Sequence, residues 1–323
     1  MEATRRNMIY GLMGTFGSCI ANRVKAAIPL DESPEAAGFR DEQSRVLARY
    51  HLSAESQFIH LTKPSLRAQV LVAGRGEPAL LIHGGGSVAV NLAGVMADLA
   101  PSFRCVAPDR PGCGLTDAFD YTNVPFREHA VNFVRSTLDA LNLQKVSLIG
   151  NSMGGLWSLY FALAMPHRVA RIVLLGGPAA SAPPPPRPRS PRPPDGDGSI
   201  DDTRRRFNML MADASRAPVE VLDADFAASR IPGAMRAWNT MVEDCTREHT
   251  TTYALRPELK NLKTPAVFIY GEKDMEGPSS LAREMAALAA NARCEIIPDA
   301  GHLVWLDQPD ACMRIMMEFR RSA

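Results

Sequence analysis

Short apolar runs alternate with helical patterns along the chain from about residue 57 onward. The runs are rich in Val, Leu and Ile, which is typical of strands buried inside a sheet. They predict strands over residues 57–62, 68–73, 79–82, 104–107, 145–149, 171–175, 266–270 and 293–297. Apolar residues at helical spacing predict helices over residues 91–100, 126–141, 155–164, 279–290 and 307–320, with further helices within residues 200–255. The alternation predicts an α/β fold in which helices flank a mainly parallel sheet.

Two parts of the chain depart from this alternation. Residues 1–56 precede the sheet pattern, and we expect them to form a helical extension. Residues 178–258 separate two predicted strands and begin with a segment rich in proline and arginine, residues 178–199. Proline lacks an amide donor and fixes φ, so this segment predicts an exposed loop, with helices after it. The alternating pattern itself occupies residues 57–177 and 259–323, which we expect to form the core.

The composition of the 323 residues is that of an ordinary globular protein, with 46% apolar and 22% charged residues. The 36 basic side chains are balanced by 35 acidic ones, so the net charge gives no reason to expect a nucleic-acid partner. No run of about 18 apolar residues occurs, so we expect no stable insertion into a membrane. The sequence does not indicate an oligomeric state.

The six cysteines are scattered, without a Cys-x-x-Cys pair or a nearby histidine at ligand spacing. This spacing predicts neither a disulfide framework nor a metal site. Dispersed cysteines in a chain of this size are usually reduced thiols, so we expect a cytoplasmic protein. The alternative rests on Arg5 and Arg6, which precede a mildly apolar stretch and resemble the start of a signal peptide. Export, or peripheral attachment to a membrane through residues 1–28, stays open on this ground.

The strongest chemical motif is Gly-Asn-Ser-Met-Gly-Gly at residues 150–155, between a predicted strand and a predicted helix. A Gly-x-Ser-x-Gly turn in that position holds the serine in a tight, strained conformation at the start of the helix. The helix dipole and its free amides then favour developing negative charge beside the hydroxyl. We therefore predict that Ser152 is a nucleophile, and the alternative is a glycine-rich packing turn.

A serine hydroxyl needs a base, and the base needs an orienting carboxylate. His302 and Asp274 both follow predicted strands, at the edge of the sheet where Ser152 is expected. Their chain order, serine, aspartate and then histidine, is the order of the α/β-hydrolase triad. His83 also ends a strand, but a structural hydrogen bond within its glycine-rich loop explains it better. Glu272 ranks second as the carboxylate, and capping of the helix that begins near residue 279 is the other interpretation of Asp274.

The run His-Gly-Gly-Gly at residues 83–86 offers backbone donors for an oxyanion, free of side chains. We expect the Gly85 amide, with Gly86 as the alternative, to act together with the amide of Met153. A phosphate-binding loop is the competing interpretation of such a run, but neither a P-loop nor a dinucleotide-binding pattern is present. We therefore do not interpret residues 83–86 as a phosphate-binding loop.

Together these motifs resemble the α/β-hydrolase superfamily over about residues 57–321. The matching pieces are residues 83–86, the Asp-Arg-Pro-Gly-Cys-Gly turn at 109–114, the turn at Ser152, Asp274, and Gly301-His302. The resemblance implies an eight-stranded, mostly parallel sheet, a helical lid over residues 178–258, and chemistry through an acyl-enzyme without a cofactor. It also implies a structural role for residues 109–114. Ser152 excludes the branch of epoxide hydrolases and haloalkane dehalogenases, which use aspartate as the nucleophile.

The turn at Ser152 also resembles that of hydrolases that cleave carbon–carbon bonds in ring-opened aromatic dienoates. In those enzymes the residue that matches Asn151 contributes to the site, although holding the turn is the alternative role for it. An aromatic residue follows the catalytic histidine there, and Trp305 is a loose match at a shifted position. Arg230 and Arg236 are candidates for binding a substrate carboxylate.

The sequence thus predicts a serine hydrolase that cleaves a small, largely apolar carboxylic ester, with a small molecule as its partner. Carbon–carbon hydrolysis of a dienoate or vinylogous diketone acid is the alternative, and a non-catalytic ligand-binding protein on the same fold is the third hypothesis. Gly86, Asn151 and Trp305 are possible substrate contacts. The tryptophans at 157, 238 and 305, with Phe126 and Met209, are expected either to wall an apolar pocket or to belong to the core.

Overall fold

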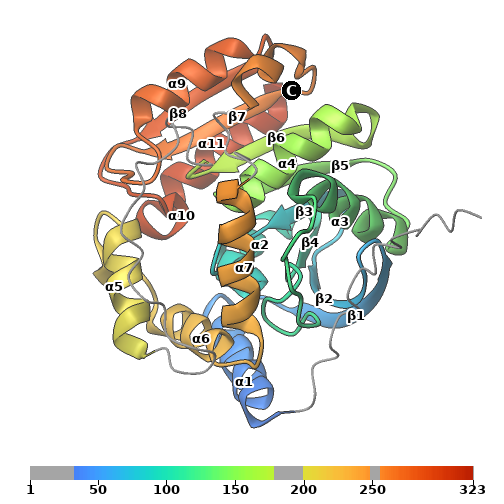
Figure 1. Cartoon of the computed structure of the whole chain (residues 1–323). Helices are drawn as coiled ribbons and strands as arrows, with labels where there is room; N and C mark the ends of the chain where they lie inside the picture. The colour runs from blue at the N-terminus through green and yellow to red at the C-terminus, as the bar shows by residue number, and fades with distance from the viewer. Residues whose placement is uncertain (1–32, 178–198, 248–254, 323) are drawn as a thin grey trace, which may run out of the picture.

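A computed structural model describes residues 33–177, 199–247 and 255–322 of the chain (Figure 1). Its centre is an eight-stranded sheet with the spatial order β1-β2-β4-β3-β5-β6-β7-β8. The strands are β1 (Ala54–Thr62), β2 (Ser65–Ala73), β3 (Glu77–Ile82), β4 (Phe103–Pro108), β5 (Val146–Asn151), β6 (Val169–Leu175), β7 (Ala266–Gly271) and β8 (Ala292–Ile297). β2 is antiparallel to both of its neighbours, and all other neighbours are parallel. The chain therefore has the predicted eight-stranded, mostly parallel sheet of the α/β-hydrolase fold.

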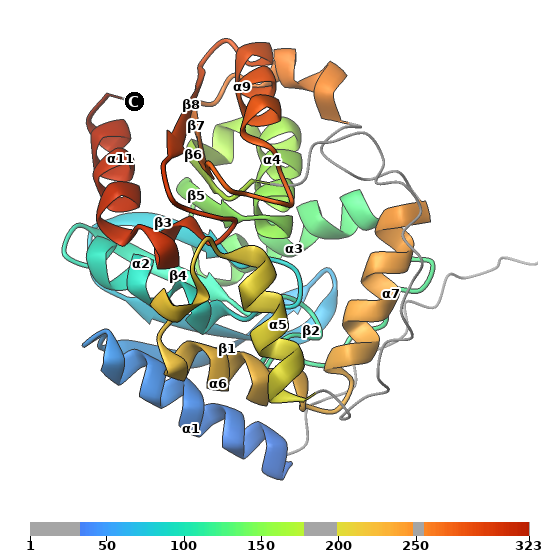
Figure 2. The same ribbon diagram turned by 90° about the vertical axis from the view of Figure 1, so that its left-hand side faces the viewer.

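Helices cover both faces of the sheet (Figure 2). One face carries α2 (Ala93–Leu99), which follows the short helix η1 (Ala89–Leu92), and α11 (Pro309–Ser322). The other face carries α3 (Phe126–Ala140), α4 (Met153–Ala164) and α9 (Ser279–Leu288). Every residue of β5 and β7 is buried, because central parallel strands have helices packed on both sides. Each face of the sheet thus has its own apolar core.

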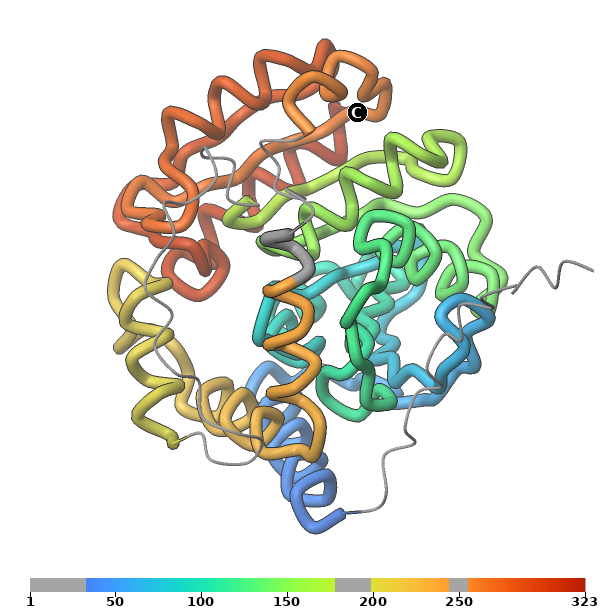
Figure 3. Tube along the Cα trace, in the orientation of Figure 1, coloured from blue at the N-terminus to red at the C-terminus, as the bar shows by residue number. Residues whose placement is uncertain are grey.

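In the described residues between β6 and β7, three α-helices are inserted outside the sheet. They are α5 (Ile200–Leu210), α6 (Val219–Ser229) and α7 (Ala234–Arg247). α5 begins with a capping box, in which the Ser199 side chain accepts from the Asp202 amide and the Asp202 carboxylate accepts from the Ser199 amide. The tube trace in Figure 3 shows α5, α6 and the N-terminal helix α1 together on one side of the molecule, opposite α9.

The helix α1 (Pro34–Arg49) precedes the sheet and packs along α6 (Figure 2). Ser33 caps it by accepting a hydrogen bond from the amide of Ala36. Phe39 is fully buried in the core cluster that α1 shares with η1 and α6. The N-terminal segment therefore contributes a helix to the apolar core that also supports the inserted helices.

The main differences from the predicted elements lie at their ends. The first strand begins at Ala54 rather than residue 57, and the predicted helix at 91–100 begins as the 3₁₀ turn η1. The last helix, predicted over 307–320, is α11, which begins at Pro309, and the short helix α10 (Val304–Asp307) precedes it. The proline- and arginine-rich segment falls mostly at 178–198, outside the described residues. The division into extension, core and insertion stays a prediction. In the described part of the chain, no helix is both long and apolar enough to cross a bilayer.

Truncation of Phe39 tests whether α1 stabilises the fold. Phe39→Ala removes a fully buried ring, so we expect the free energy of unfolding to fall by about 3–5 kcal/mol. Phe58→Ala is the matched control, because that ring is 39% exposed and its loss is expected to cost less than about 1 kcal/mol. Chemical denaturation measures both changes. Equal small losses would show that α1 docks without supporting the core.

Candidate active site

Ser152 stands at the turn that joins β5 to α4, in a backbone conformation that side chains rarely adopt. Its φ is 49° and its ψ is −116°. Glycines permit the tight turn: a Cβ on Gly150 would lie 2.5 Å from the carbonyl oxygen of Gly154, and a Cβ on Gly154 would overlap the carbonyl oxygen of Ile82. This is the backbone geometry of a nucleophile elbow, in which a strained turn presents the serine at the start of a helix.

Neighbouring backbone holds this turn in place. The amide of Ser152 donates to the carbonyl oxygen of Gly176 at 3.0 Å, and the Asn151 side chain donates to that of Leu175 at 2.7 Å. Asn151 is only 3% exposed. Its side chain therefore ties the turn to the end of β6, which is the structural role considered for it, and it also lines the cavity described below.

His302 and Asp274 form a buried pair. The Nδ1 atom of His302 lies 2.9 Å from Oδ2 and 3.0 Å from Oδ1 of Asp274, and the two side chains are 4% and 0% exposed. Asp274 Oδ1 also accepts from the amides of Glu276 and Gly277. The helix α9 starts at Ser279 without a side-chain cap, so the interpretation of Asp274 as its cap is wrong.

The rival carboxylate, Glu272, points elsewhere. One of its oxygens lies 3.5 Å from the backbone amide of Asp299, and no hydrogen bond joins it to His302. Its side chain is exposed, whereas Asp274 is buried behind the imidazole. The structure therefore brings together the histidine and the aspartate that the sequence ranked first.

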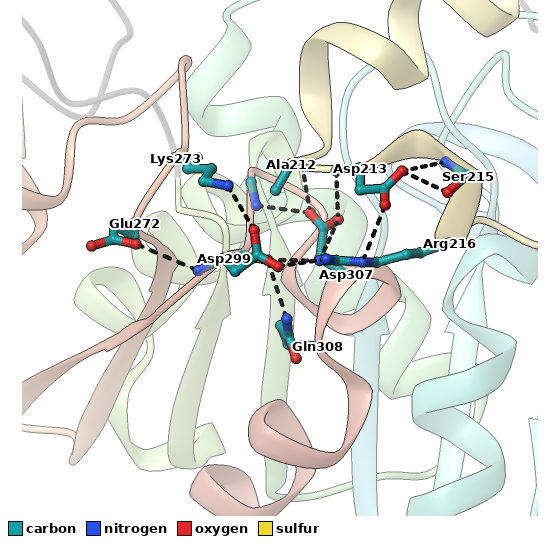
Figure 4. A network of polar contacts seen from close by, with 10 residues as sticks. Ala212, Asp213, Ser215, Arg216, Glu272, Lys273, Asp299, Asp307 and Gln308 are labelled. Atoms are coloured by element: carbon teal, nitrogen blue, oxygen red, sulfur yellow. Dashed lines mark hydrogen bonds and ion pairs between the residues drawn. The ribbon is translucent and has the colours of Figure 1, made fainter.

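The loop that carries His302 is attached to the inserted helices. The amide of His302 donates a hydrogen bond of 2.6 Å to the carbonyl oxygen of Leu210, at the end of α5. Asp307, whose side chain is fully buried, accepts from the amides of Gly301 at 2.7 Å, Ala212 at 2.9 Å and Asp213 at 3.2 Å (Figure 4). Backbone donors from two distant segments thus share one carboxylate, which joins the histidine loop to the insertion.

Charged side chains surround this junction at the surface. Asp299 pairs with Arg216 and with Lys273, whose Nζ atom lies 2.6 Å away, and Gln308 donates to its carbonyl oxygen (Figure 4). These two cations lower the pKa of Asp299 to about 2. Arg216 also lies 3.6 Å from Asp213. The network therefore fastens the residues just before His302 to the segment between α5 and α6.

Ser152 and His302 line one cavity of about 300 Å³. Its wall is largely apolar and comes from the core and the inserted helices, including Leu156, Phe207, Met209, Leu210, Trp238, Leu303, Trp305 and Leu306. Gly85 and Met153, the predicted oxyanion donors, and Asn151 and Trp305, the possible substrate contacts, also line it. Gly86 is not part of the wall, and its carbonyl oxygen instead accepts from Arg206.

The aromatic residues divide between the wall and the core. Trp238, Trp305 and Met209 line the cavity, and Trp305 donates from Nε1 to the carbonyl oxygen of Asn91 at 3.0 Å. Phe126 of α3 and Trp157 of α4 are fully buried in the core between these helices and the sheet. Of their two predicted locations, the core is therefore correct and the pocket wall is wrong. Periodicity alone could not separate the two locations, because both favour large apolar rings.

The cation of the cavity is Arg206, on α5. It pairs with the buried Asp225, which also accepts from the Asn91 side chain at 2.8 Å. The two arginines proposed from the sequence lie elsewhere: Arg230 is exposed at the end of α6, and Arg236 pairs with Asp120 at 2.8 Å. The prediction that Arg230 or Arg236 binds a substrate carboxylate is therefore wrong, and Arg206 is the arginine that lines the cavity.

Sequence reasoning did not single out Arg206, because it is the last of three consecutive arginines. Arg204 and Arg205 pair with acidic residues one helical turn earlier, Asp201 and Asp202, as on an ordinary solvated helix face. Only the placement of Phe207 and Leu210 toward the cavity identifies the inward face of α5. A helical projection of residues 200–210 would have been the available signal.

The glycine-rich loop after β3 is held from behind. The Nε2 atom of His83 accepts a hydrogen bond from the amide of Arg110 at a distance of 2.9 Å. The Nδ1 atom therefore carries the proton, and it donates to the carbonyl oxygen of Gly84, also at 2.9 Å. This is the structural hydrogen bond predicted for His83. Asp109 accepts from the amides of Ala89 and Leu115, and burial raises its pKa to about 7. Residues 109–114 therefore support the loop structurally.

The chain matches the model of the alpha/beta hydrolase family over residues 79–315, and it belongs to that family. Among curated relatives, the 2-hydroxy-6-oxo-6-phenylhexa-2,4-dienoate hydrolase of Burkholderia cepacia is 25% identical over 284 residues, which cover 83% of this chain and 96% of the relative. The solved structure of a meta-cleavage product hydrolase from Pseudomonas fluorescens has a TM-score of 0.70 and 25% identity, covering 82% of this chain and 97% of that one.

An esterase structure shares the same fold. A carboxylesterase from Bacillus subtilis superposes with a TM-score of 0.71, covering 90% of this chain and all (100%) of that one. Its identity is 18%, so this likeness concerns the fold alone. The fold and family are thereby established.

The buried histidine His129 predicts a pH dependence of stability. It packs among Phe119, Tyr121 and Trp157, and burial, with a smaller contribution from Arg110, lowers its pKa to about 3. The unfolded chain takes up this proton near pH 6.5, whereas the folded chain does not. Stability is therefore fully present above pH 6.5 and is lost as the pH falls toward 3.

Replacement of this histidine should reduce that loss. We expect His129→Phe to flatten the dependence of unfolding free energy on pH between 6.5 and 3 by up to about 1.4 kcal/mol per pH unit. The exposed His60 provides the control variant, His60→Gln. Denaturation series at several pH values measure the slopes, and an unchanged slope for His129→Phe would contradict the assigned pKa.

Proposed function

We propose that this protein is a serine hydrolase that cleaves a carbon–carbon bond in a small dienoate acid. In this proposal Ser152 is the nucleophile, His302 the general base and then acid, and Asp274 the carboxylate that orients the imidazole. The observation that carries the proposal is that the strained Ser152 and the Asp274-bound His302 line one cavity. A nucleophile, a base and an orienting acid are the minimum set for covalent catalysis by serine.

The proposed reaction begins with attack on a substrate ketone. His302 removes the proton of the Ser152 hydroxyl as its oxygen bonds to the carbonyl carbon, and negative charge moves to the carbonyl oxygen. In the keto tautomer of the substrate, the bond to the neighbouring carbon then breaks, its electron pair is delocalised as a dienolate, and that carbon takes the proton from His302. Water, deprotonated by the same imidazole, hydrolyses the acyl-enzyme and releases a carboxylic acid with the free serine.

The developing oxyanion needs donors that are already in position. We propose that the backbone amides of Met153 and Gly85 supply them. Met153 is the first residue of α4, where amides have no partner within the helix, and both residues line the cavity. Donors fixed in advance are worth more than water because they need no reorganisation during the reaction.

Two observations support a dienoate acid rather than another acyl compound. The curated relative from Burkholderia cepacia is named as a hydrolase of such a dienoate, and it matches 83% of this chain. Among the described residues, the cavity combines an apolar wall with the guanidinium of Arg206 beside its partner Asp225, and this guanidinium can donate to the carboxylate of a substrate that also has an apolar group. A guanidinium binds a carboxylate through two parallel hydrogen bonds.

Hydrolysis of a small carboxylic ester is the second candidate. The catalytic groups are the same, since an alkoxide can leave in place of a dienolate. The observation that favours it is the pairing of Arg206 with Asp225, because this pair makes the polar end of the cavity neutral overall. A neutral ester can bind there without displacing a charge partner.

Covalent labelling tests the nucleophile. We expect the purified protein to react with a fluorophosphonate probe and Ser152→Ala to lose both labelling and turnover, by more than about 1000-fold. Ser158→Ala on the same helix is the control, because that hydroxyl is fully buried and donates to the carbonyl oxygen of Gly154. Labelling that persists without Ser152 would remove it from the mechanism. Ligand binding without any turnover would favour the non-catalytic hypothesis.

Substitution of Arg206 separates the two substrates. We expect Arg206→Gln to raise KM for a 2-hydroxy-6-oxo-dienoate by about tenfold or more, because a charge-assisted hydrogen bond is lost. Hydrolysis of a short p-nitrophenyl ester should change much less. Arg205→Gln, on the exposed side of α5, is the matched control. Equal effects on both substrates, or turnover of the ester alone by the unaltered protein, would favour the esterase.

A further inference from the structure

Arg110 is a fully buried cation directly behind the glycine-rich loop. It follows β4, and its side chain has an exposed fraction of 0%. Its Nη2 atom donates to the carbonyl oxygen of Gly84 at 2.7 Å, its Nη1 atom lies 3.3 Å from the sulfur of Met241, and its guanidinium carbon lies 5.0 Å from the Trp157 ring centroid. In the described part of the chain, no acidic side chain pairs with it.

Burial of an arginine without a carboxylate partner is costly, and such groups are retained where they serve a purpose. The only oxygen that Arg110 contacts through its guanidinium, among the described residues, is the Gly84 carbonyl oxygen. That oxygen also accepts from His83 Nδ1 at 2.9 Å. Two donors, one of them charged, therefore converge on a single peptide group.

The position of this peptide matters because its other end is the amide of Gly85. In the described residues the one cis peptide bond joins Lys63 to Pro64, so the bond between Gly84 and Gly85 is trans. The C=O and N–H groups of a trans peptide point in opposite directions. Because the Gly84 carbonyl faces Arg110, the Gly85 amide faces away from it, and both glycines line the cavity.

We propose that Arg110 is a positioning residue that orients and polarises the Gly84–Gly85 peptide for oxyanion binding. Withdrawal of electron density at the carbonyl oxygen increases the positive charge on the amide hydrogen of the same peptide. Hydrogen bonds that share a group strengthen one another in this way, and a charged donor has the larger effect. Arg110 itself contacts no substrate. The inference rests on the proposed function, because the oxyanion arises from attack by Ser152.

The surroundings of Arg110 suit this role better than a general packing role. A flat guanidinium can stack on Trp157 while one nitrogen donates to Gly84, whereas an ammonium has no flat face. The interior of the protein screens charge weakly, so the cation acts strongly on the one dipole that it contacts. An apolar side chain would fill the same space without this electrostatic effect.

The test compares Arg110→Met with Arg110→Lys in the full chain. Arg110→Met removes the buried charge while keeping a long apolar stem, so we expect it to fold. We expect kcat for a p-nitrophenyl butyrate to fall about tenfold with KM changed less than about twofold. Loss of an oxyanion donor outright costs about 100- to 1000-fold, and loss of its polarisation should cost less. Arg110→Lys, which keeps the charge, should recover most of kcat.

A transition-state mimic provides the readout that a packing role would not alter. An alkyl boronic acid forms a tetrahedral adduct with the serine, whereas butyramide binds without one. We expect Arg110→Met to weaken the boronic acid by the same factor as kcat/KM and to leave butyramide unchanged. Met241→Leu is the control, because it removes the contact of Arg110 with the Met241 sulfur and keeps the hydrogen bond of Arg110 to Gly84. This variant should retain the activity of the unaltered protein.

Two outcomes would overturn the inference. One is unchanged kcat and boronic-acid affinity in Arg110→Met, and the other is equal weakening of boronic acid and butyramide, as expected from a general disturbance of the cavity. Should Arg110→Met fail to fold, Arg110→Gln is measured by the same criteria. Failure of the proposed covalent catalysis by Ser152, on which the inference rests, is recognised separately, because the unaltered protein would then neither turn over the ester nor form the boronic-acid adduct.

Discussion

The close approach of α4 to β5 and β3 is the constraint on which the rest of the candidate site depends. It holds Ser152 at a φ of 49°, and it requires glycine at 154, where a Cβ would overlap the Ile82 carbonyl oxygen. Such backbone strain persists only where surrounding structure enforces it. Here the fully buried strand β5 and the hydrogen bonds from the turn to Leu175 and Gly176, at the end of β6, enforce it, so the sheet core and the site are parts of one packing arrangement.

The histidine and aspartate of the candidate site come from segments far apart in the chain. Asp274 follows β7, His302 follows β8, and the loop of His302 is bonded to the end of α5 through Leu210 and Asp307. The inserted helices therefore have two roles at once. They wall the cavity, and they hold the backbone around the imidazole. A change in the insertion would reach the histidine through hydrogen bonds, without any direct contact with its ring.

Buried charge is distributed around the cavity in three ways. Asp274 is matched by the His302 ring, and Arg206 by Asp225. Arg110 has a peptide carbonyl in place of an acid. Each arrangement gives a desolvated charge at least one polar partner, but each leaves a different field at the cavity. The proposals about substrate and oxyanion follow from these differences rather than from the shape of the pocket.

The alternation of elements, the turn at Ser152 and the ranking of His302 and Asp274 could be inferred from the sequence. These signals are local, since periodicity, glycine spacing and position after a strand are all visible within a few residues. Element ends were less accurate, as at Pro309, because caps and turns compete with pattern there. The choice of Arg206 over Arg230 and Arg236 could not be made, since the direction in which α5 faces depends on how the insertion packs.

The sequence by itself determined the fold class and which side chains carry the candidate chemistry. The tertiary structure alone decided which charges meet. Asp307 joins residues 212 and 301, Asp225 meets Arg206 and Asn91, and Arg110 reaches back to Gly84. The physical reason is that partners of buried polar groups are chosen by proximity after folding, and segments distant in sequence come close only when the apolar faces of the sheet and helices are buried together.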